Sequence, residues 1–141
     1  MMPLVAFDLD GTLLEAPPGM DYDDIEAVAR MAPIEAAVRR ARSLRRLGHP
    51  IVVVTGRREE LRWMTELQVA VLLGPGVPIH MQAQWRGVSG LVAMKSETLR
   101  GQGAALFVGD SVFDARAAEA AGTRFLHATA FAAGEPLPAA A

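Results

Sequence analysis

Apolar residues in this chain occur in short continuous runs that are separated by longer stretches with helical spacing. A continuous run favours a strand covered on both faces, because a half-exposed strand would alternate apolar and polar residues. The clearest runs are LVAF, IVVV and AALFV, and two weaker ones are PIHMQ and TRFLH. We therefore expect five strands, at residues 4–7, 51–54, 78–82, 104–108 and 123–127.

Helical stretches lie between these runs. Residues 33–47 begin with Pro33 and stop at Gly48, which suit the first turn and the end of a helix. Other expected helices are 58–73, 96–100 and 112–121. Strand followed by helix, repeated along the chain, predicts a parallel sheet with helices on both faces. The sequence thus predicts an α/β fold: one three-layer α/β/α Rossmann-like domain, residues 1–130, with a central, mainly parallel five-stranded sheet.

Two segments do not follow this alternation. Residues 15–32 contain Pro17, Pro18, Gly19 and three aspartates, so we expect a loop or flap over the end of the first strand. No segment is long enough to form a large cap domain. Residues 131–141 have little to bury, and we expect them to form a flexible C-terminal tail.

Composition excludes several classes of function. The chain has no cysteine, which excludes disulfides, thiolate zinc sites and a cysteine nucleophile. It has neither a membrane-length apolar stretch nor a signal-peptide pattern, so we expect a cytoplasmic protein. The net charge of −2 provides no global positive field for nucleic acid. One arginine cluster is either a solvated helix face or a contact for a polynucleotide backbone: Arg39, Arg40, Arg42, Arg45 and Arg46.

Polar residues follow the expected strands at the point where each strand ends. In open parallel sheets, ligands bind beyond the carboxyl ends of the strands. Asp8 and Asp10 follow the first strand, and residues two apart in an extended chain point the same way, so both can serve one ligand. The other strand ends contribute Thr55, Gly56, Arg57, Asp110 and, within the next helix, Asp114.

Several carboxylates at one edge of a sheet require positive charge among them. Two unit charges about 4 Å apart cost about 4 kcal/mol at an effective dielectric near 20. Oxygen ligands without histidine or cysteine suit a hard cation such as Mg²⁺. Lys95 is the single lysine among the 14 basic residues, which indicates a position where a guanidinium would not serve.

The segment DLDGT, residues 8–12, resembles the D-x-D-G-T signature of the haloacid dehalogenase superfamily of phosphohydrolases. Thr55, which follows the run VVV, is similar to the second motif of that superfamily, and Lys95 before SETL is similar to the third. GDSVFD, residues 109–114, resembles the fourth motif, G-D-x-x-x-D. The motifs occur in the superfamily's order over residues 4–127.

The resemblance implies a Mg²⁺-dependent phosphatase with an aspartyl-phosphate intermediate. Asp8 would be the nucleophile, and Asp10 would protonate the leaving oxygen and then activate water. Thr55 and Lys95 would stabilise charge on the phosphoryl oxygens. Asp114 would contact the metal or its waters, or fix Lys95. The metal ligands that the resemblance implies are Asp8, Asp110, Asp114 and Asp10, the last through its backbone carbonyl. The substrate-binding residues that it implies are Gly11, Thr55, Gly56 and Arg57.

The identity of the substrate stays open. IVVVTGR, GVPIHMQAQWR and KSETL are similar to segments of the phosphatase domain of polynucleotide kinase/3′-phosphatases, which implies a phosphorylated nucleic-acid end. A phosphorylated small molecule is the alternative, and a non-catalytic phosphate-binding or regulatory module would have no need of Asp10. Small uncapped members of such families often use a neighbouring copy as a lid, so a homo-oligomer is compatible with the sequence.

Overall fold

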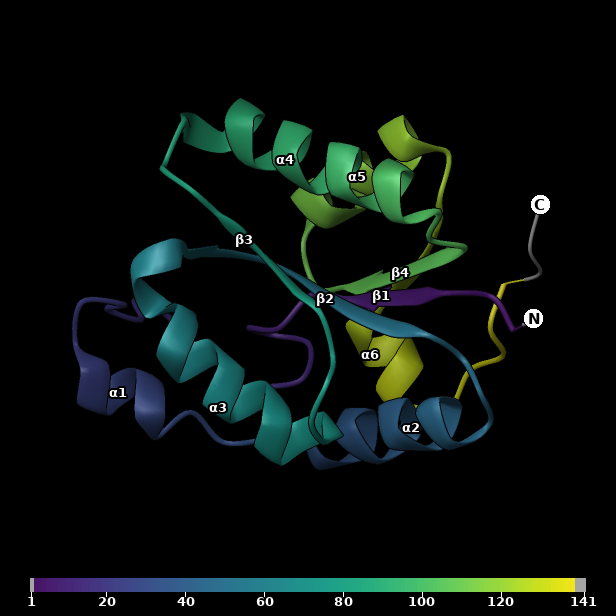
Figure 1. The fold of residues 1–141 in the computed structure, drawn as a ribbon, viewed down its shortest axis with the longest axis horizontal. Helices are drawn as coiled ribbons and strands as arrows, with labels where there is room; N and C mark the ends of the chain where they lie inside the picture. The colour runs from purple at the N-terminus through teal and green to yellow at the C-terminus, as the bar shows by residue number, and fades with distance from the viewer. Residues whose placement is uncertain (1, 139–141) are drawn as a thin grey trace.

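Five strands form one parallel sheet in the order β3-β2-β1-β4-β5 in the computed structural model, which describes residues 2–138. Central strand β1 pairs on one side with β2, where Val5 lies opposite Ile51, and on the other side with β4, where Val5 lies opposite Leu106. Figure 1 shows the twist of this sheet. The strands are β1 Val5–Phe7, β2 Ile51–Arg58, β3 Ile79–Gln82, β4 Leu106–Gly109 and β5 Arg124–His127.

Successive residues of the central strands enter two separate hydrophobic cores. Phe7 and Val53 belong to the core on one face of the sheet, and Ala6 and Val52 belong to the core on the other. All four side chains are buried. Both faces of these strands are covered, as the continuous apolar runs of the sequence predicted.

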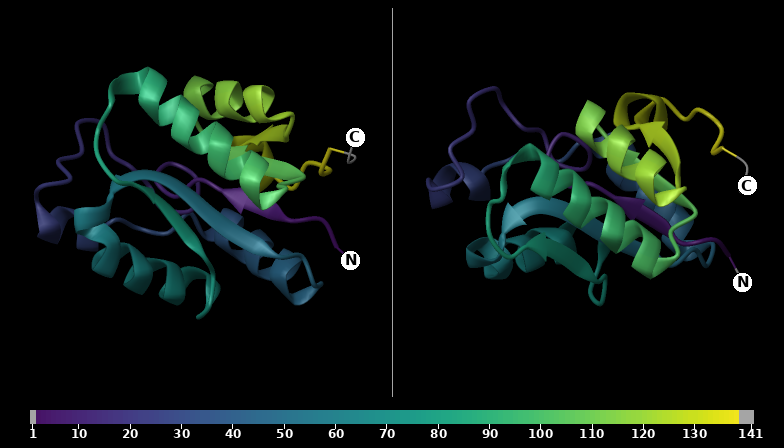
Figure 2. Two further views of the ribbon diagram at one scale, coloured as in Figure 1. Left: turned by 45° about the horizontal axis from the view of Figure 1, so that its top comes forward. Right: turned by 90° about the horizontal axis from the view of Figure 1, so that it is seen from above.

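Helices cover both faces of the sheet, as Figures 1 and 2 show. α4 and α5 lie together on one face, and α1, α2, α3 and α6 lie on the other. The predicted three-layer α/β/α fold is confirmed. Across residues 2–138, every helix falls short of the length and apolarity that a membrane span requires. The helices are α1 Ile25–Ala29, α2 Glu35–Arg46, α3 Arg62–Leu73, α4 Gly87–Gln102, α5 Val112–Ala121 and α6 Ala128–Ala132.

Two elements are longer than the sequence predicts. Helix α4 begins at Gly87 instead of residue 96, and its first turn contains two glycines and a valine, which are weak helix formers. Strand β2 continues past residue 54 to Arg58, so Thr55, Gly56 and Arg57 belong to the strand itself. The helix expected at 58–73 is preceded by a 3₁₀ turn, Glu59–Leu61, and α3 follows it directly.

The two irregular segments contain more structure than expected. Residues 15–32 include α1, whose first turn is capped by the Asp24 carboxylate accepting from the Ala27 amide at 3.2 Å. The C-terminal tail begins later than residue 131, because Phe131 is fully buried in α6 and packs edge-on against Phe7 at 5.2 Å between ring centroids. Residues 139–141 of the expected tail lie outside the described residues.

Candidate active site

Three carboxylates converge at the carboxyl edge of the sheet. Asp8 follows β1, Asp110 follows β4, and Asp114 lies in the first turn of α5. Each offers one oxygen within 4.8 Å of the others. Asp8 and Asp114 are buried, whereas Asp110 is exposed. This cluster is a set of hard oxygen donors that fits a cation such as Mg²⁺.

The ammonium group of Lys95 lies between two of these carboxylates. Its Nζ donates to Asp8 Oδ1 at 3.1 Å and to Asp114 Oδ1 at 2.7 Å. Burial lowers the pKa of Lys95, but Asp8 and Asp114 outweigh it and hold the pKa above its ordinary value. Burial raises the pKa of Asp8, Lys95 opposes this, and Asp114 and Asp110 add to it. Lys95 therefore stays charged and keeps two acids together in a buried position.

Asp114 is fixed by a capping box at the start of α5. Its Oδ2 accepts from the backbone amides of Asp110 and Ser111, and its own amide donates to Ser111 Oγ at 3.1 Å. With Oδ1 bound to Lys95, both oxygens of Asp114 have partners. A Cβ on Gly109 would lie 2.6 Å from Asp114 Oδ2, so this carboxylate requires a glycine beside it.

Gly11 makes room for the exposed member of the cluster. A Cβ at this position would lie 1.9 Å from Asp110 Oδ2, and its φ of +82° is in the left-handed region. Because Gly11 has no side chain, the turn after β1 can lie in contact with Asp110 at the end of β4.

Asp10 faces a different cation from Asp8. Arg57 donates from Nε to Asp10 Oδ2 at 2.9 Å and from Nη2 to Asp10 Oδ1 at 2.7 Å. Its Nη1 donates to Thr65 Oγ1 at 3.1 Å and to Gln68 Oε1 at 2.6 Å, both on α3. Only 4% of Arg57 is exposed, so the guanidinium is a buried clamp on Asp10.

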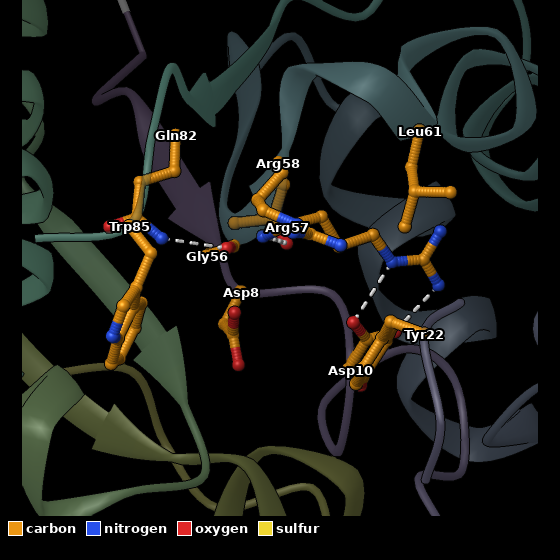
Figure 3. Close-up of a pocket in the computed structure, with 10 residues that line it drawn as sticks. Asp8, Asp10, Tyr22, Gly56, Arg57, Arg58, Leu61, Gln82 and Trp85 are labelled. Atoms are coloured by element: carbon orange, nitrogen blue, oxygen red, sulfur yellow. Dashed lines mark hydrogen bonds and ion pairs between the residues drawn. The ribbon is translucent and has the colours of Figure 1, made fainter. Parts of the chain in front are cut away.

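A cavity of about 490 Å³ opens beside Asp8 and Asp10 (Figure 3). Thr55 and Gly56 of β2 lie on its wall, and Thr55 Oγ1 accepts from the Arg57 amide at 3.2 Å. Trp85 lies at one side of Asp8 in Figure 3 and Tyr22 at the other. The remaining lining residues are Arg57, Arg58, Leu61 and Gln82.

The arginine cluster of α2 lies away from this cavity. Helix α2 ends at Arg46, shortly before β2 begins, so its last turn lies at the amino edge of the sheet, opposite the carboxylates. Arg42 donates to the carbonyls of Leu72 and Val71, and Arg45 donates to those of Leu73 and Pro75. These arginines cap the C-terminal end of α3 and do not line the site.

Neither a protein-family model nor a curated protein matches this sequence. Solved structures match its fold. A chain of the Pnkp1/Rnl/Hen1 RNA repair complex has a TM-score of 0.73 at 16% identity, over 89% of this chain and 42% of that one. The D,D-heptose 1,7-bisphosphate phosphatase from B. bronchiseptica, complexed with magnesium and phosphate, has a TM-score of 0.65 at 17% identity, over 99% and 90%. A HAD family hydrolase from Deinococcus radiodurans R1, with bound phosphate and sodium, has a TM-score of 0.64 at 19% identity, over 89% and 80%.

This chain has the haloacid dehalogenase fold. It spans less than half of the chain that it matches in the RNA repair complex, where the covered share is 42%. At the carboxyl edge of this haloacid dehalogenase fold, the structure brings Asp8, Asp110, Asp114 and Lys95 into one cluster, and Asp8, Asp10, Thr55, Gly56 and Arg57 onto one cavity.

Several residues of the site were not predicted from the sequence. Tyr22, Leu61 and Gln82 line the cavity, and Thr65 and Gln68 hold Arg57. Burial raises the pKa of Tyr22, and Asp10 raises it further. Leu61 and Gln82 look like ordinary core or strand positions. Only Tyr22 could have been identified from the sequence, because it is the single tyrosine of a segment expected to cover the end of the first strand.

Gly11→Ala tests the close approach to Asp110. We expect the new Cβ to displace the Asp110 carboxylate and to weaken Mg²⁺ binding by about 10- to 100-fold, measured by isothermal titration calorimetry. Gly101→Ala is the matched control, because among residues 2–138 a Cβ at that helical position would meet nothing within 4 Å beyond its chain neighbours and the backbone of its own helix. Equal Mg²⁺ affinity in Gly11→Ala and Gly101→Ala would contradict this account of the cluster.

Arg57→Lys tests whether Arg57 positions Asp10 or binds the phosphate, as the sequence resemblance implies. A lysine cannot make the two-nitrogen contact, so we expect kcat on an aryl phosphate to fall by about 10- to 100-fold with little change in KM. Arg30→Lys is the control, because Arg30 is exposed and lies outside the residues that line the cavity. A large rise in KM with kcat preserved would instead assign Arg57 to phosphate binding.

Proposed function

We propose that this protein is a Mg²⁺-dependent phosphomonoester hydrolase that works through an aspartyl-phosphate on Asp8. The observation that carries the proposal is the separate fixing of two aspartates beside one cavity. Lys95 holds Asp8, and Arg57 holds Asp10. A site that only bound phosphate would need one acid for the metal and would have no use for a second, independently clamped acid at the cavity wall.

In the first step, a carboxylate oxygen of Asp8 attacks the phosphorus, and the bond from phosphorus to the leaving oxygen breaks. Asp10 donates its proton to that oxygen. In the second step, water attacks the same phosphorus, Asp10 takes a proton from the water, and the bond to Asp8 breaks. Lys95 stabilises negative charge next to Asp8, and the hydroxyl of Thr55 lies on the cavity wall where it can donate to a phosphoryl oxygen.

The donor set fits a hard divalent cation. Asp8 and Asp110, with the backbone carbonyl of Asp10, would hold Mg²⁺, whose charge lets an anionic nucleophile approach an anionic phosphate. Asp114 supports the site from outside that set, because its two oxygens are occupied by Lys95 and by backbone amides. Solved structures of this fold with magnesium and phosphate, or with sodium and phosphate, support the assignment.

The reaction is tested with a generic aryl phosphate. We expect phosphate release that requires Mg²⁺, is lost on chelation, and falls by more than about 1,000-fold in Asp8→Asn, because the covalent route is removed. Asp21→Asn is the matched control, since Asp21 is exposed and, among the described residues, its carboxylate bonds only to the nearby Asp23 amide. A folded, Mg²⁺-binding preparation that turns over no phosphoester would overturn the proposal in favour of a phosphate-binding module.

A second candidate concerns the substrate: a 3′-phosphorylated nucleic-acid end in place of a phosphorylated small molecule. Trp85 favours it, because 58% of this indole is exposed where it lines the cavity, ready to stack on a base. The likeness to a chain of an RNA repair complex supports it too. The arginine cluster of α2 does not, because its members are not among the residues that line the cavity, and Arg42 and Arg45 bond to carbonyls at the C-terminal end of α3.

A substrate panel separates the two candidates. For a 3′-phosphorylated oligonucleotide, we expect Trp85→Ala to raise KM by about tenfold, the loss of about 1.4 kcal/mol of stacking. Trp63→Ala is the control, because Trp63 is equally exposed but lies outside the cavity. If sugar phosphates are better substrates than the oligonucleotide, and Trp85→Ala leaves the oligonucleotide KM unchanged, the nucleic-acid candidate is wrong.

A further inference from the structure

Helix α3 carries an apolar stripe on its outer face. Trp63, Leu67 and Val71 are 55%, 60% and 75% exposed, and none of them lines the active-site cavity. Their spacing of four residues places them in one line along the helix. Ala70 beside them is exposed as well, and Glu66 is the one charged residue among the exposed positions of α3. A helix that faced only water would carry polar residues here.

The two ends of this stripe have opposite charge. The 3₁₀ turn before α3 carries Glu59 and Glu60, which pair with Arg62 and Arg58, and Glu66 in the first turns of α3 shares Arg62. Over residues 58–66 this end therefore has one carboxylate more than it has guanidinium groups. At the other end, Arg42 and Arg45 of α2 cap the last turn of α3, with Arg46 beside them. Within residues 2–138, no carboxylate forms an ion pair with any of these three arginines, so the basic end has unused charge.

We propose that two copies of this chain associate through α3, antiparallel and about a two-fold axis near Leu67. In that arrangement, the stripe of one copy covers the stripe of the other, because Trp63 and Val71 lie equally far, about 6 Å, on either side of Leu67. The acidic end of each α3 then faces the basic end of the other. A parallel arrangement would place Arg42, Arg45 and Arg46 of the two copies together, which disfavours it. The antiparallel contact is self-complementary, as a closed dimer requires.

A depression at the basic end is suited to receive the indole of Trp63. It has a volume of about 470 Å³ and is lined by Ala70, Val71, Leu73, Gly74 and the guanidinium-bearing residues Arg42, Arg45 and Arg46. Trp63 of the second copy lies opposite Val71 in the antiparallel arrangement, at this depression. An indole against apolar side chains and guanidinium groups is a typical centre of binding energy in protein interfaces.

Sedimentation equilibrium on the full chain tests the proposal. From micromolar to near-millimolar concentration, we expect the wild-type mass to approach twice that of one chain. Leu67→Lys places two ammonium groups together at the axis, and we expect the dissociation constant to rise by at least about 30-fold. Val112→Lys is the matched control, because Val112 is 59% exposed on α5 at the other face of the sheet, and it should dimerise like the wild type.

Fluorescence gives an independent measurement. In a Trp85→Phe chain, Trp63 is the remaining tryptophan, and its emission should shift to shorter wavelength as concentration rises. Circular dichroism checks that each variant is folded. The proposal is wrong if the wild type stays monomeric throughout this range, or if Leu67→Lys dimerises as tightly as Val112→Lys. Neither result would bear on the phosphatase proposal, because the stripe lies outside the cavity.

Discussion

The contact of the Lys95 ammonium with Asp8 and Asp114 is the interaction around which the site is arranged. Asp8 follows β1, Asp114 lies in α5 and Lys95 in α4, so this contact joins residues that are 87 and 19 positions apart in the sequence. Buried carboxylates in this number would otherwise repel each other. The lysine offsets part of that repulsion between Asp8 and Asp114, whereas Asp110, the third carboxylate of the cluster, is exposed. Gly11 and Gly109 are required because the carboxylates lie against the backbone.

The two aspartates after β1 are distinguished by their partners. β1 ends at Phe7, so Asp8 and Asp10 lie in the turn that follows, and Leu9 between them is fully buried. Both carboxylates reach the same cavity, but one is held by a lysine and the other by an arginine. Lys95 lies on α4 and Arg57 on β2, so each carboxylate is held in place by a different element of the fold. The remaining fold supplies these cations in fixed positions.

Much of this arrangement could be predicted from sequence, because strand ends in a parallel sheet meet at one edge. The sheet, its strands and the grouping of Asp8 with Asp110 follow from that rule. The partner of Arg57 could not be predicted: a guanidinium next to the second strand can point to the cavity or away from it, and contacts from Thr65 and Gln68 on α3 decide this. Likewise, Phe131 lies in an alanine-rich stretch, and only its packing on Phe7 shows that the tail begins after it.

The most direct test of the central claim is to look for phosphate on Asp8. Asp10→Asn should slow hydrolysis of the intermediate more than its formation from an aryl phosphate, whose leaving group needs little protonation. We predict that acid quenching during turnover, followed by peptide mass spectrometry, finds one phosphoryl group on the peptide containing Asp8. Turnover by this variant with no covalent phosphate on Asp8 at any time would contradict the account, because water would then attack the substrate directly.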